Sequence, residues 1–205
     1  VSQIDDPSAF GVVKLNKENI ITDFVEKPKT FISDLAIIGI YYFNDGEYLK
    51  SELQYLLDND IKDKGEYQLT NALENMKNKG TKFSLGKVNE WLDCGNKDAT
   101  VYTNERVLEH NGNIISANAL VENSEIIEPC FIGDNAVIKN SKIGPHVAVG
   151  NNSVISNSVI SKTIIQNESS IVDAQLNNSM IGNKVTFNGN NIKQEVSIGD
   201  FSEVK

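Results

Sequence analysis

The chain has 205 residues, 40% of them hydrophobic and 23% charged, a composition typical of folded proteins and not of disordered ones. A net charge of −9 and a single arginine, Arg106, argue against a nucleic-acid-binding surface. The cysteines, Cys94 and Cys130, are too few for a disulfide framework. The sequence also has no apolar run typical of a signal peptide or a membrane span. These two observations predict a cytoplasmic protein without a membrane partner.

Strand-like and helix-like segments alternate over the first 112 residues. Runs rich in β-branched and aromatic residues predict strands at residues 10–15, 20–25, 35–43 and 82–88. Apolar residues spaced for one helical face predict helices at residues 48–57 and 67–76. Asn96 suits the N-cap of a third helix, which runs to His110 and ends at Asn111-Gly112. This order of elements is typical of an α/β domain.

After residue 114 the helical pattern stops, and aliphatic residues recur at steps of five or six. The recurring positions are Ile132, Ile138, Ile143, Val149, Ile155, Ile160, Ile165, Ile171, Leu176, Ile181, Phe187, Ile192, Ile198 and Val204. Every third position (132, 149, 165, 181 and 198) marks a repeat of 16 or 17 residues, and Ile115, Val121 and Ile126 extend the pattern by one turn. Gly and Asn, common between these positions, tolerate the positive φ that sharp corners can demand.

Such a repeat predicts a triangular coil of short strands. Each turn stacks its aliphatic residues on the next turn, since no single turn can bury its own apolar face. A β-sandwich would instead place its turns roughly every 8–12 residues. The run resembles the hexapeptide-repeat family, and this resemblance alone implies a left-handed β-helix. We therefore predict an α/β domain at residues 1–112 and a left-handed parallel β-helix at residues 113–205.

Three short motifs in the first domain could carry chemistry. Glu26-Lys27-Pro28 ends a strand, and Pro28 is expected to hold Lys27 extended. Lysine suits a phosphate and glutamate suits hydroxyl groups, although an ordinary solvated pair is the simpler interpretation of three residues. Asp93, in Trp91-Leu-Asp-Cys-Gly-Asn96, precedes a glycine and a helix N-cap, a place where a hard cation or a phosphate can sit, or it could simply stabilise a turn. The third motif, Gly65-Glu-Tyr-Gln-Leu-Thr70, is by itself only a helix start.

Taken in order, these motifs and two others resemble the sugar-1-phosphate nucleotidyltransferase family. The five motifs are Pro7-Ser-Ala-Phe-Gly-Val-Val13, Phe24-Val-Glu-Lys-Pro28, Ala36-Ile-Ile-Gly-Ile-Tyr-Tyr-Phe43, Gly65-Glu-Tyr-Gln-Leu-Thr70 and Trp91-Leu-Asp-Cys-Gly95. The likeness is greatest to glucose-1-phosphate thymidylyltransferases, with mannose-1-phosphate guanylyltransferases near. It covers residues 1–110, and long members of the family append a β-helix.

The resemblance implies a role for each matched position in the sugar site. The backbone at Gly11 and the carboxylate of Glu26 would hold the sugar hydroxyls. Lys27 would bind the sugar phosphate and act in catalysis, and Ile37 and Tyr41 would lie against the sugar.

The resemblance also implies Asp93 as one of two carboxylates on Mg²⁺. A sugar-phosphate oxygen would attack the α-phosphorus of a nucleoside triphosphate and expel pyrophosphate, with Lys27 and the ion offsetting the repulsion between two anions. Asn71 departs from the family's usual Asp, which leaves any role at that position open. Asn96 replaces a usual Thr as a cap of the same kind.

The family's glycine-rich triphosphate loop has no match here, because no two glycines stand two positions apart. The chain also begins with Val1. We therefore expect the carboxy-terminal part of a longer enzyme, inactive by itself. Half of a parallel sheet would leave edges and apolar surface exposed, which predicts poor solubility, a rearranged first half or oligomerisation, and we expect a homo-oligomer.

Two other functions remain open for the β-helix. It could be an assembly or regulatory module without catalytic activity. It could also be an acyltransferase that uses coenzyme A, with His146 as the general base, although a corner histidine without a catalytic role is the simpler interpretation.

Overall fold

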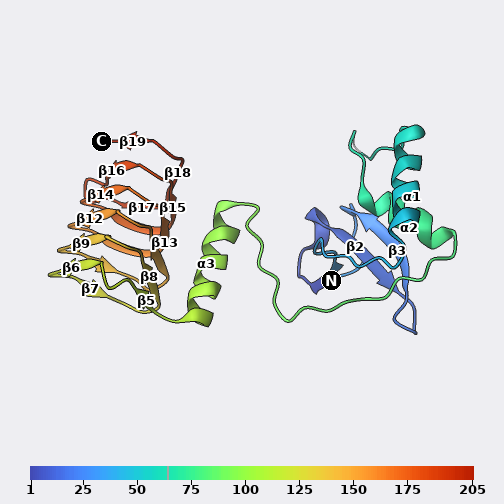
Figure 1. Cartoon of the computed structure of the whole chain (residues 1–205), viewed down its shortest axis with the longest axis horizontal. Helices are drawn as coiled ribbons and strands as arrows, with labels where there is room; N and C mark the ends of the chain where they lie inside the picture. The colour runs from blue at the N-terminus through green and yellow to red at the C-terminus, as the bar shows by residue number, and fades with distance from the viewer. Residues whose placement is uncertain (64) are drawn as a thin grey trace. The chain divides into compact units, whose positions relative to one another are not determined.

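The structure, a computed structural model, describes residues 1–63 and 65–205. These residues form two compact units, Val1–Trp91 and Leu92–Lys205. The first is a small sheet with two helices, and the second is a long helix with a coil of parallel strands (Figure 1). The α/β region followed by a β-helix that the sequence predicts is confirmed.

The sheet of the first unit has the strand order β1-β4-β2-β3 and is antiparallel throughout. Its strands are β1 (Ser2–Gln3), β2 (Gly11–Leu15), β3 (Ile21–Glu26) and β4 (Leu35–Ala36), and a 3₁₀ turn, η1 (Pro7–Ala9), precedes β2. The strands predicted at 10–15 and 20–25 are therefore confirmed, but the parallel pairing is wrong for the described residues.

Two of the predicted strands are largely absent from this sheet. The prediction of a strand at 35–43 is wrong beyond Ala36, because no described strand pairs with residues 37–43, and Tyr42 is 89% exposed. Residues 82–88 contribute only one bridge, between Ile20 and Ser84. Hydrophobicity alone does not make a strand where no partner offers hydrogen bonds.

Two helices, α1 (Gly46–Asp58) and α2 (Leu69–Asn78), confirm the helical periodicity of the first unit. The Asp45 carboxylate caps α1 by accepting a hydrogen bond from the Tyr48 amide, at 2.9 Å. Helix α2 packs on both α1 and β3 and buries Leu73 and Met76. The buried Glu52 of α1 is paired with Lys79, just after α2, at 2.6 Å. This contact ties the two helices together.

Helix α3 (Lys97–Asn111) begins and ends where the sequence predicts. The Asn96 side chain accepts a hydrogen bond from the Ala99 amide, and Gly112 follows the helix with φ 75°. Val101 and Leu108 are buried where α3 packs on strands of the coil, so the compact units divide before this helix. The domain boundary expected from the sequence, with an α/β domain at residues 1–112 and a β-helix at residues 113–205, stays a prediction.

The coil is a parallel β-solenoid of about five turns, consistent with a left-handed β-helix. Its strands are β5 (Ile114–Ile115), β6 (Leu120–Glu122), β7 (Glu125–Ile126), β8 (Cys130–Ile132), β9 (Val137–Lys139), β10 (Lys142–Ile143), β11 (Val147–Val149), β12 (Val154–Ser156), β13 (Val159–Ile165), β14 (Ser170–Val172), β15 (Gln175–Ile181), β16 (Thr186–Asn188), β17 (Lys193–Gln194), β18 (Ser197–Ile198) and β19 (Glu203–Val204). Each strand pairs in parallel with its equivalent one turn away; Ile155, for example, lies between Ile138 and Ile171. The triangular coil is confirmed.

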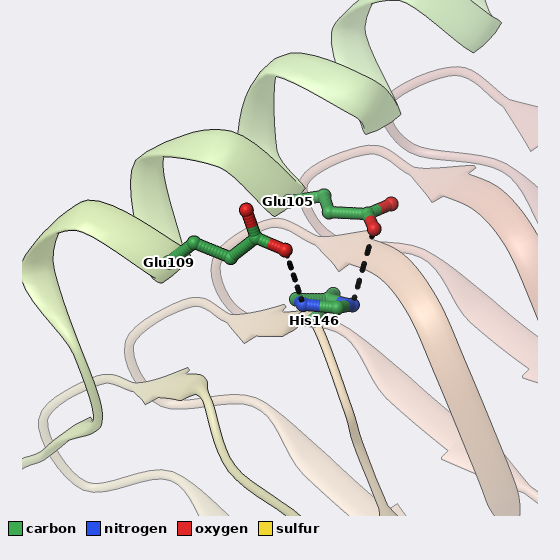
Figure 2. A group of neighbouring side chains, drawn as sticks. All are labelled: Glu105, Glu109 and His146. Carbon is green, nitrogen blue, oxygen red and sulfur yellow. Dashed lines mark ion pairs between the residues drawn. The ribbon is translucent and has the colours of Figure 1, made fainter.

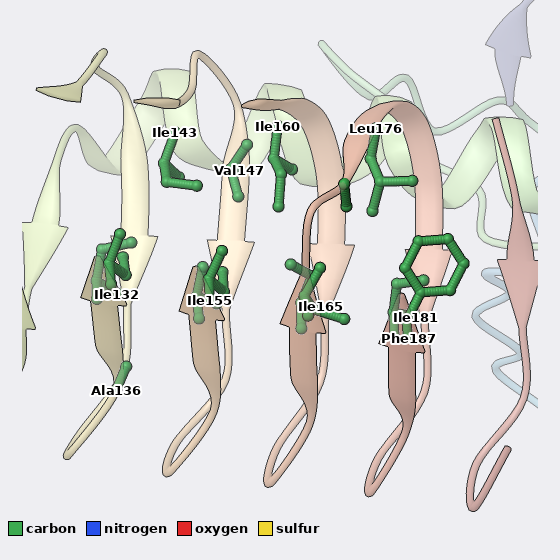
Figure 3. Close-up of a cluster of buried hydrophobic side chains, with 14 of the residues drawn as sticks. Ile132, Ala136, Ile143, Val147, Ile155, Ile160, Ile165, Leu176, Ile181 and Phe187 are labelled. Carbon is green, nitrogen blue, oxygen red and sulfur yellow. The ribbon is translucent and has the colours of Figure 1, made fainter. Parts of the chain in front are cut away.

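The predicted aliphatic positions form the interior of the solenoid (Figure 3). Those in the middle turns are almost fully buried, from Ile132 to Phe187. Ile192 is wrong as an inward residue: it is 60% exposed, and Gln194 stands opposite Leu176 in its place. Ile115 and Val121, in the first turn, are also exposed.

Asparagines line one corner of the solenoid and satisfy one another. Asn123, Asn140 and Asn157 all have φ near 50°, a conformation that Asn adopts more readily than most residues. The side-chain Nδ2 of Asn140 donates to Asn157 Oδ1 at 3.4 Å, and the side-chain Nδ2 of Asn157 donates to Asp173 Oδ1 at 3.1 Å. The polar residues between the aliphatic positions therefore form ladders that follow the stack of turns.

Glycine at the corner after β11 permits close contact between two turns. A methyl group on Gly150 would lie 2.6 Å from the carbonyl carbon of Gln166 and 2.7 Å from the Asn167 nitrogen. Gly199 follows a strand in the same way near the end of the solenoid, and a methyl group there would meet nothing within 4 Å. We expect Gly150→Ala to destabilise the solenoid by about 1–3 kcal/mol through overpacking, and Gly199→Ala to change its stability by no more than about 0.5 kcal/mol. Urea unfolding followed by circular dichroism measures both, and equal effects would contradict the turn-to-turn contact.

Candidate functional site

The first unit brings three of its predicted site residues, Gly11, Glu26 and Ile37, close together, and adds Thr70, to which the sequence assigned no role. Gly11 opens β2 and pairs with Glu26, the last residue of β3. The Ile37 amide donates to the Gly11 carbonyl at 2.8 Å. From α2, the Thr70 hydroxyl donates to Glu26 Oε2 at 3.2 Å, which fixes the direction of the carboxylate.

A side chain at Gly11 would crowd three neighbouring side chains. A methyl group there would lie 2.9 Å from Glu26 Oε2, 3.2 Å from Thr70 Cγ2 and 3.3 Å from Ile37 Cδ1. The buried backbone of Gly11 can therefore approach Glu26 closely, as the edge of a small polar site requires.

Lys27 follows Glu26 directly, and its backbone differs from the prediction. Its φ is 41°, so the extended conformation expected before Pro28 is wrong. The turn is held by a hydrogen bond of 3.0 Å from the Lys27 amide to the Phe10 carbonyl and by the buried ring of Pro28. Lys27 itself is exposed. The Lys27 ammonium is accordingly a solvated charge on a rigid turn.

Tyr41 lies near Glu26, although it belongs to the segment that does not become a strand. Burial raises the pKa of the Tyr41 phenol, and the negative charge of Glu26 raises it further. Tyr41 and Ile37 also line an apolar cavity of about 440 Å³, together with Phe24, Leu73 and other residues. The site thus has a carboxylate next to an aromatic and aliphatic wall, an arrangement that suits a ligand with both hydroxyl groups and apolar faces.

Asp93 belongs to the second unit, and its joint action with Glu26 and Lys27 stays a prediction. Its Oδ2 accepts a hydrogen bond from the Gly95 amide at 3.1 Å. The Asp93 carbonyl accepts one from the Thr103 hydroxyl at 2.7 Å, so α3 holds this loop. One exposed carboxylate fits Mg²⁺ only as a single ligand among phosphate and water oxygens.

A second polar cluster lies in the second unit, where α3 crosses the solenoid (Figure 2). His146 Nδ1 is 3.6 Å from Glu105 Oε1, and His146 Nε2 is 3.4 Å from Glu109 Oε1. The sequence pointed to His146 but not to the two glutamates. Their spacing of four residues on a helix was a usable signal, but nothing in the sequence placed that face of α3 on residue 146.

The fold and these motifs define an α/β region of a nucleotidyl-transfer protein joined to a β-solenoid. Residues 1–110, more than half of the chain, match the family described as Nucleotidyl transferase, and the chain belongs to this family.

The chain is similar to several curated proteins of related function. It is 28% identical over 150 residues to a glucose-1-phosphate thymidylyltransferase of Streptomyces antibioticus, a match that covers 65% of this chain and 41% of that protein. It is 31% identical over 136 residues to the bifunctional protein GlmU of Methanocaldococcus jannaschii (62% and 31%). It is 27% identical over 152 residues to a glucose-1-phosphate adenylyltransferase of Clostridium acetobutylicum (63% and 39%). The matched part thus spans about a third to two fifths of these relatives. No helix among the described residues is long and apolar enough to cross a membrane.

The proximity of Tyr41 and Glu26 can be tested by titrating the phenol. We expect Glu26→Gln to lower the pKa of Tyr41 toward its ordinary value but not fully, because burial is the larger cause of the shift. The raised pKa also makes the free energy of unfolding depend on pH. The contribution of Tyr41 to stability is fully present below the unfolded tyrosine pKa of about 10, and it is lost as the pH rises through the higher pKa of the folded state. Ultraviolet difference titration measures the phenol, with Tyr41→Phe identifying its signal. An unchanged Tyr41 pKa in Glu26→Gln would contradict this geometry.

Proposed function

We propose that the first unit binds the sugar phosphate in a sugar-1-phosphate nucleotidyltransferase, which joins a nucleoside triphosphate and a hexose 1-phosphate into a nucleotide sugar and pyrophosphate. The observation that carries the proposal is the convergence of Gly11, Glu26, Ile37 and Thr70, from four segments, on one small polar site. The family match and the names of the relatives support the same reaction class.

Each residue then has a distinct role in binding. Glu26 accepts hydrogen bonds from sugar hydroxyls, with Thr70 holding one of its oxygens. Tyr41 and Ile37 lie against the apolar faces of the ring. Lys27 places a positive charge on the phosphate, which offsets the repulsion as that phosphate approaches the triphosphate.

Asp93 supplies one carboxylate to Mg²⁺ in this proposal. The ion, when bound, neutralises developing charge on the phosphates. The part of Asp93 is to present an oxygen from a loop that Thr103 and Gly95 hold in place.

The triphosphate side of the reaction has no matching motif in these 205 residues, because no glycine-rich loop of the family type occurs among them. We therefore propose that this chain alone does not turn over. The reaction belongs in the cytoplasm, in keeping with two free cysteines.

The solenoid serves as an assembly module in this proposal. The exposed aromatic ring of Phe201 supports this role, because large apolar side chains are enriched where subunits meet. Acyl transfer by His146 has no support, because its side chain is only 14% exposed and both ring nitrogens face carboxylates.

Binding of a hexose 1-phosphate to this chain tests the sugar-site proposal. In calorimetric titrations with glucose 1-phosphate, we expect Lys27→Ala to weaken binding about ten-fold or more, as removal of a charged partner of phosphate does. Lys29→Ala is the matched control, since Lys29 is an exposed lysine two residues away, and it should change affinity less than two-fold, or about 0.4 kcal/mol. Equal losses of affinity in the two variants would show that only the overall positive charge matters, and would contradict the assigned role of Lys27.

The proposed inactivity of the chain alone is tested by pyrophosphate release. With Mg²⁺, glucose 1-phosphate and each of dTTP, UTP, GTP, CTP and ATP in turn, no turnover above the buffer rate is expected. Release that depends on both Lys27 and Asp93 would show that these 205 residues turn over without a glycine-rich loop of the family type, and would overturn the expected inactivity while supporting the two assigned roles.

A further inference from the structure

The polar cluster on α3 and the solenoid is built from rigid elements. Glu105 and Glu109 stand one turn apart on α3 and point to the same side (Figure 2). His146 lies at a solenoid corner with φ 62°, where its amide donates to the Pro129 carbonyl at 2.8 Å. Its carbonyl accepts from the Asn104 side chain at 3.3 Å. The three side chains therefore meet on a backbone that is already fixed.

The distances within the cluster are long for hydrogen bonds. Charge-assisted hydrogen bonds to carboxylates measure about 2.7–2.9 Å, whereas the two imidazole–carboxylate distances are 3.4 and 3.6 Å. Two ligands bound at about 2.0–2.1 Å to a tetrahedral ion lie roughly 3.3 Å apart. The distance from His146 Nδ1 to Glu105 Oε1 is close to this separation, whereas Glu109 faces the other ring nitrogen. His146 Nδ1 is also buried without a hydrogen-bond partner, which is costly for a ring nitrogen.

Each carboxylate also contacts a cation. The Lys162 ammonium is 3.1 Å from Glu105 Oε2 and donates to Glu105 Oε1 at 3.4 Å, and Glu109 Oε2 pairs with Arg106. These cations hold the two carboxylates beside the ring, as neighbours that orient metal ligands do. They also reduce the negative charge of the cluster, so a tightly bound Mg²⁺ or Ca²⁺ is not expected.

We propose that Glu105, Glu109 and His146 form a binding site for a divalent transition metal ion of the zinc class. One imidazole nitrogen and two carboxylates are donors that such ions accept, with water completing the coordination. One ligand atom from each residue already lies within 4.8 Å of the other two, and the exposed Glu109 can move to close the set around one ring nitrogen.

The ion would fasten α3 to the solenoid. Because α3 also holds the Asp93 loop through Thr103, the ion would fix that loop on the second unit as well. The binding site itself does not depend on the proposed nucleotidyl transfer.

Metal titration tests the site directly. The experiments use the full chain with Cys94→Ser, which removes the exposed thiol as a competing ligand. We expect Co²⁺ to give the visible absorption of a tetrahedral site, and Zn²⁺ to bind with a Kd of about 10 μM or tighter by calorimetry. Zn²⁺ at 100 times its Kd should raise the Tm of the second unit by roughly 5–10 °C.

Three variants and a matched control locate the ion. Glu105→Gln, Glu109→Gln and His146→Gln should each weaken Zn²⁺ binding about ten-fold or more. Glu122→Gln, at a solenoid glutamate paired with Lys139 at 2.9 Å, should leave it unchanged. Circular dichroism verifies folding, and the exposed Glu109 keeps the test available if His146→Gln unfolds. Since the chain has two histidines, NMR should show Zn²⁺ shifting the His146 ring signals and not those of His110.

Two results would overturn the proposal. The first is no binding of Zn²⁺ or Co²⁺ to the folded chain, which would leave His146 as a ring held between two carboxylates. The second is binding that survives Glu109→Gln and His146→Gln but disappears in Asp93→Asn, which would place the ion on Asp93. Neither result bears on sugar-phosphate binding, so failure here and failure of the proposed function are distinguishable.

Discussion

The stack of aliphatic side chains inside the solenoid is the constraint on which the second unit depends. A single turn has three short strands and no opposite face, so it buries its apolar residues only against the turns before and after it. Ile138, Ile155 and Ile171 show the result, since parallel pairing brings the same side chain to the same place in successive turns. The stack also constrains the residues between the aliphatic positions. The corners must be tight, which favours Asn and Gly there. The polar groups at those corners must form hydrogen bonds with the equivalent residues of the neighbouring turns.

Helix α3 connects the solenoid to the loop that carries Asp93. The helix lacks the continuous apolar stripe of a typical core helix and buries only Val101 and Leu108 among its residues. Polar contacts supply the rest of its attachment: Lys97 donates to the Asn178 carbonyl at 2.9 Å, and Glu105 pairs with Lys162. Such contacts are individually weak when solvated. The position of α3, and of the Asp93 loop that it holds, is therefore more sensitive to charge and bound ions than the solenoid core is.

The features that the sequence predicts well are those that depend on local or periodic patterns. The solenoid, the three helices and the Asn96 cap belong to this group. Residues 37–43 do not form a strand because strand formation needs a partner, which no local pattern reveals. Ile192 fails for a related reason: residues 189–192 lie between β16 and β17 and shift the repeat, so Gln194 takes the place opposite Leu176. The cluster of Glu105, Glu109 and His146 depends on how one helix face meets one corner, and periodicity carries no such information.

The candidate sugar residues and Asp93 depend on different parts of the fold. Glu26 is fixed by its pairing with Gly11 and by Thr70 of α2, all within the first unit. Asp93 is fixed by Thr103 of α3, and α3 is fixed by the solenoid. A reaction that needs both carboxylates therefore requires two independently stabilised units to act together. If the proposed roles hold, changes at the contact between α3 and the solenoid displace Asp93 and leave Glu26 in place. A substitution that lowers turnover without changing sugar-phosphate affinity is thus a natural consequence of this division, even when it lies far from either ligand.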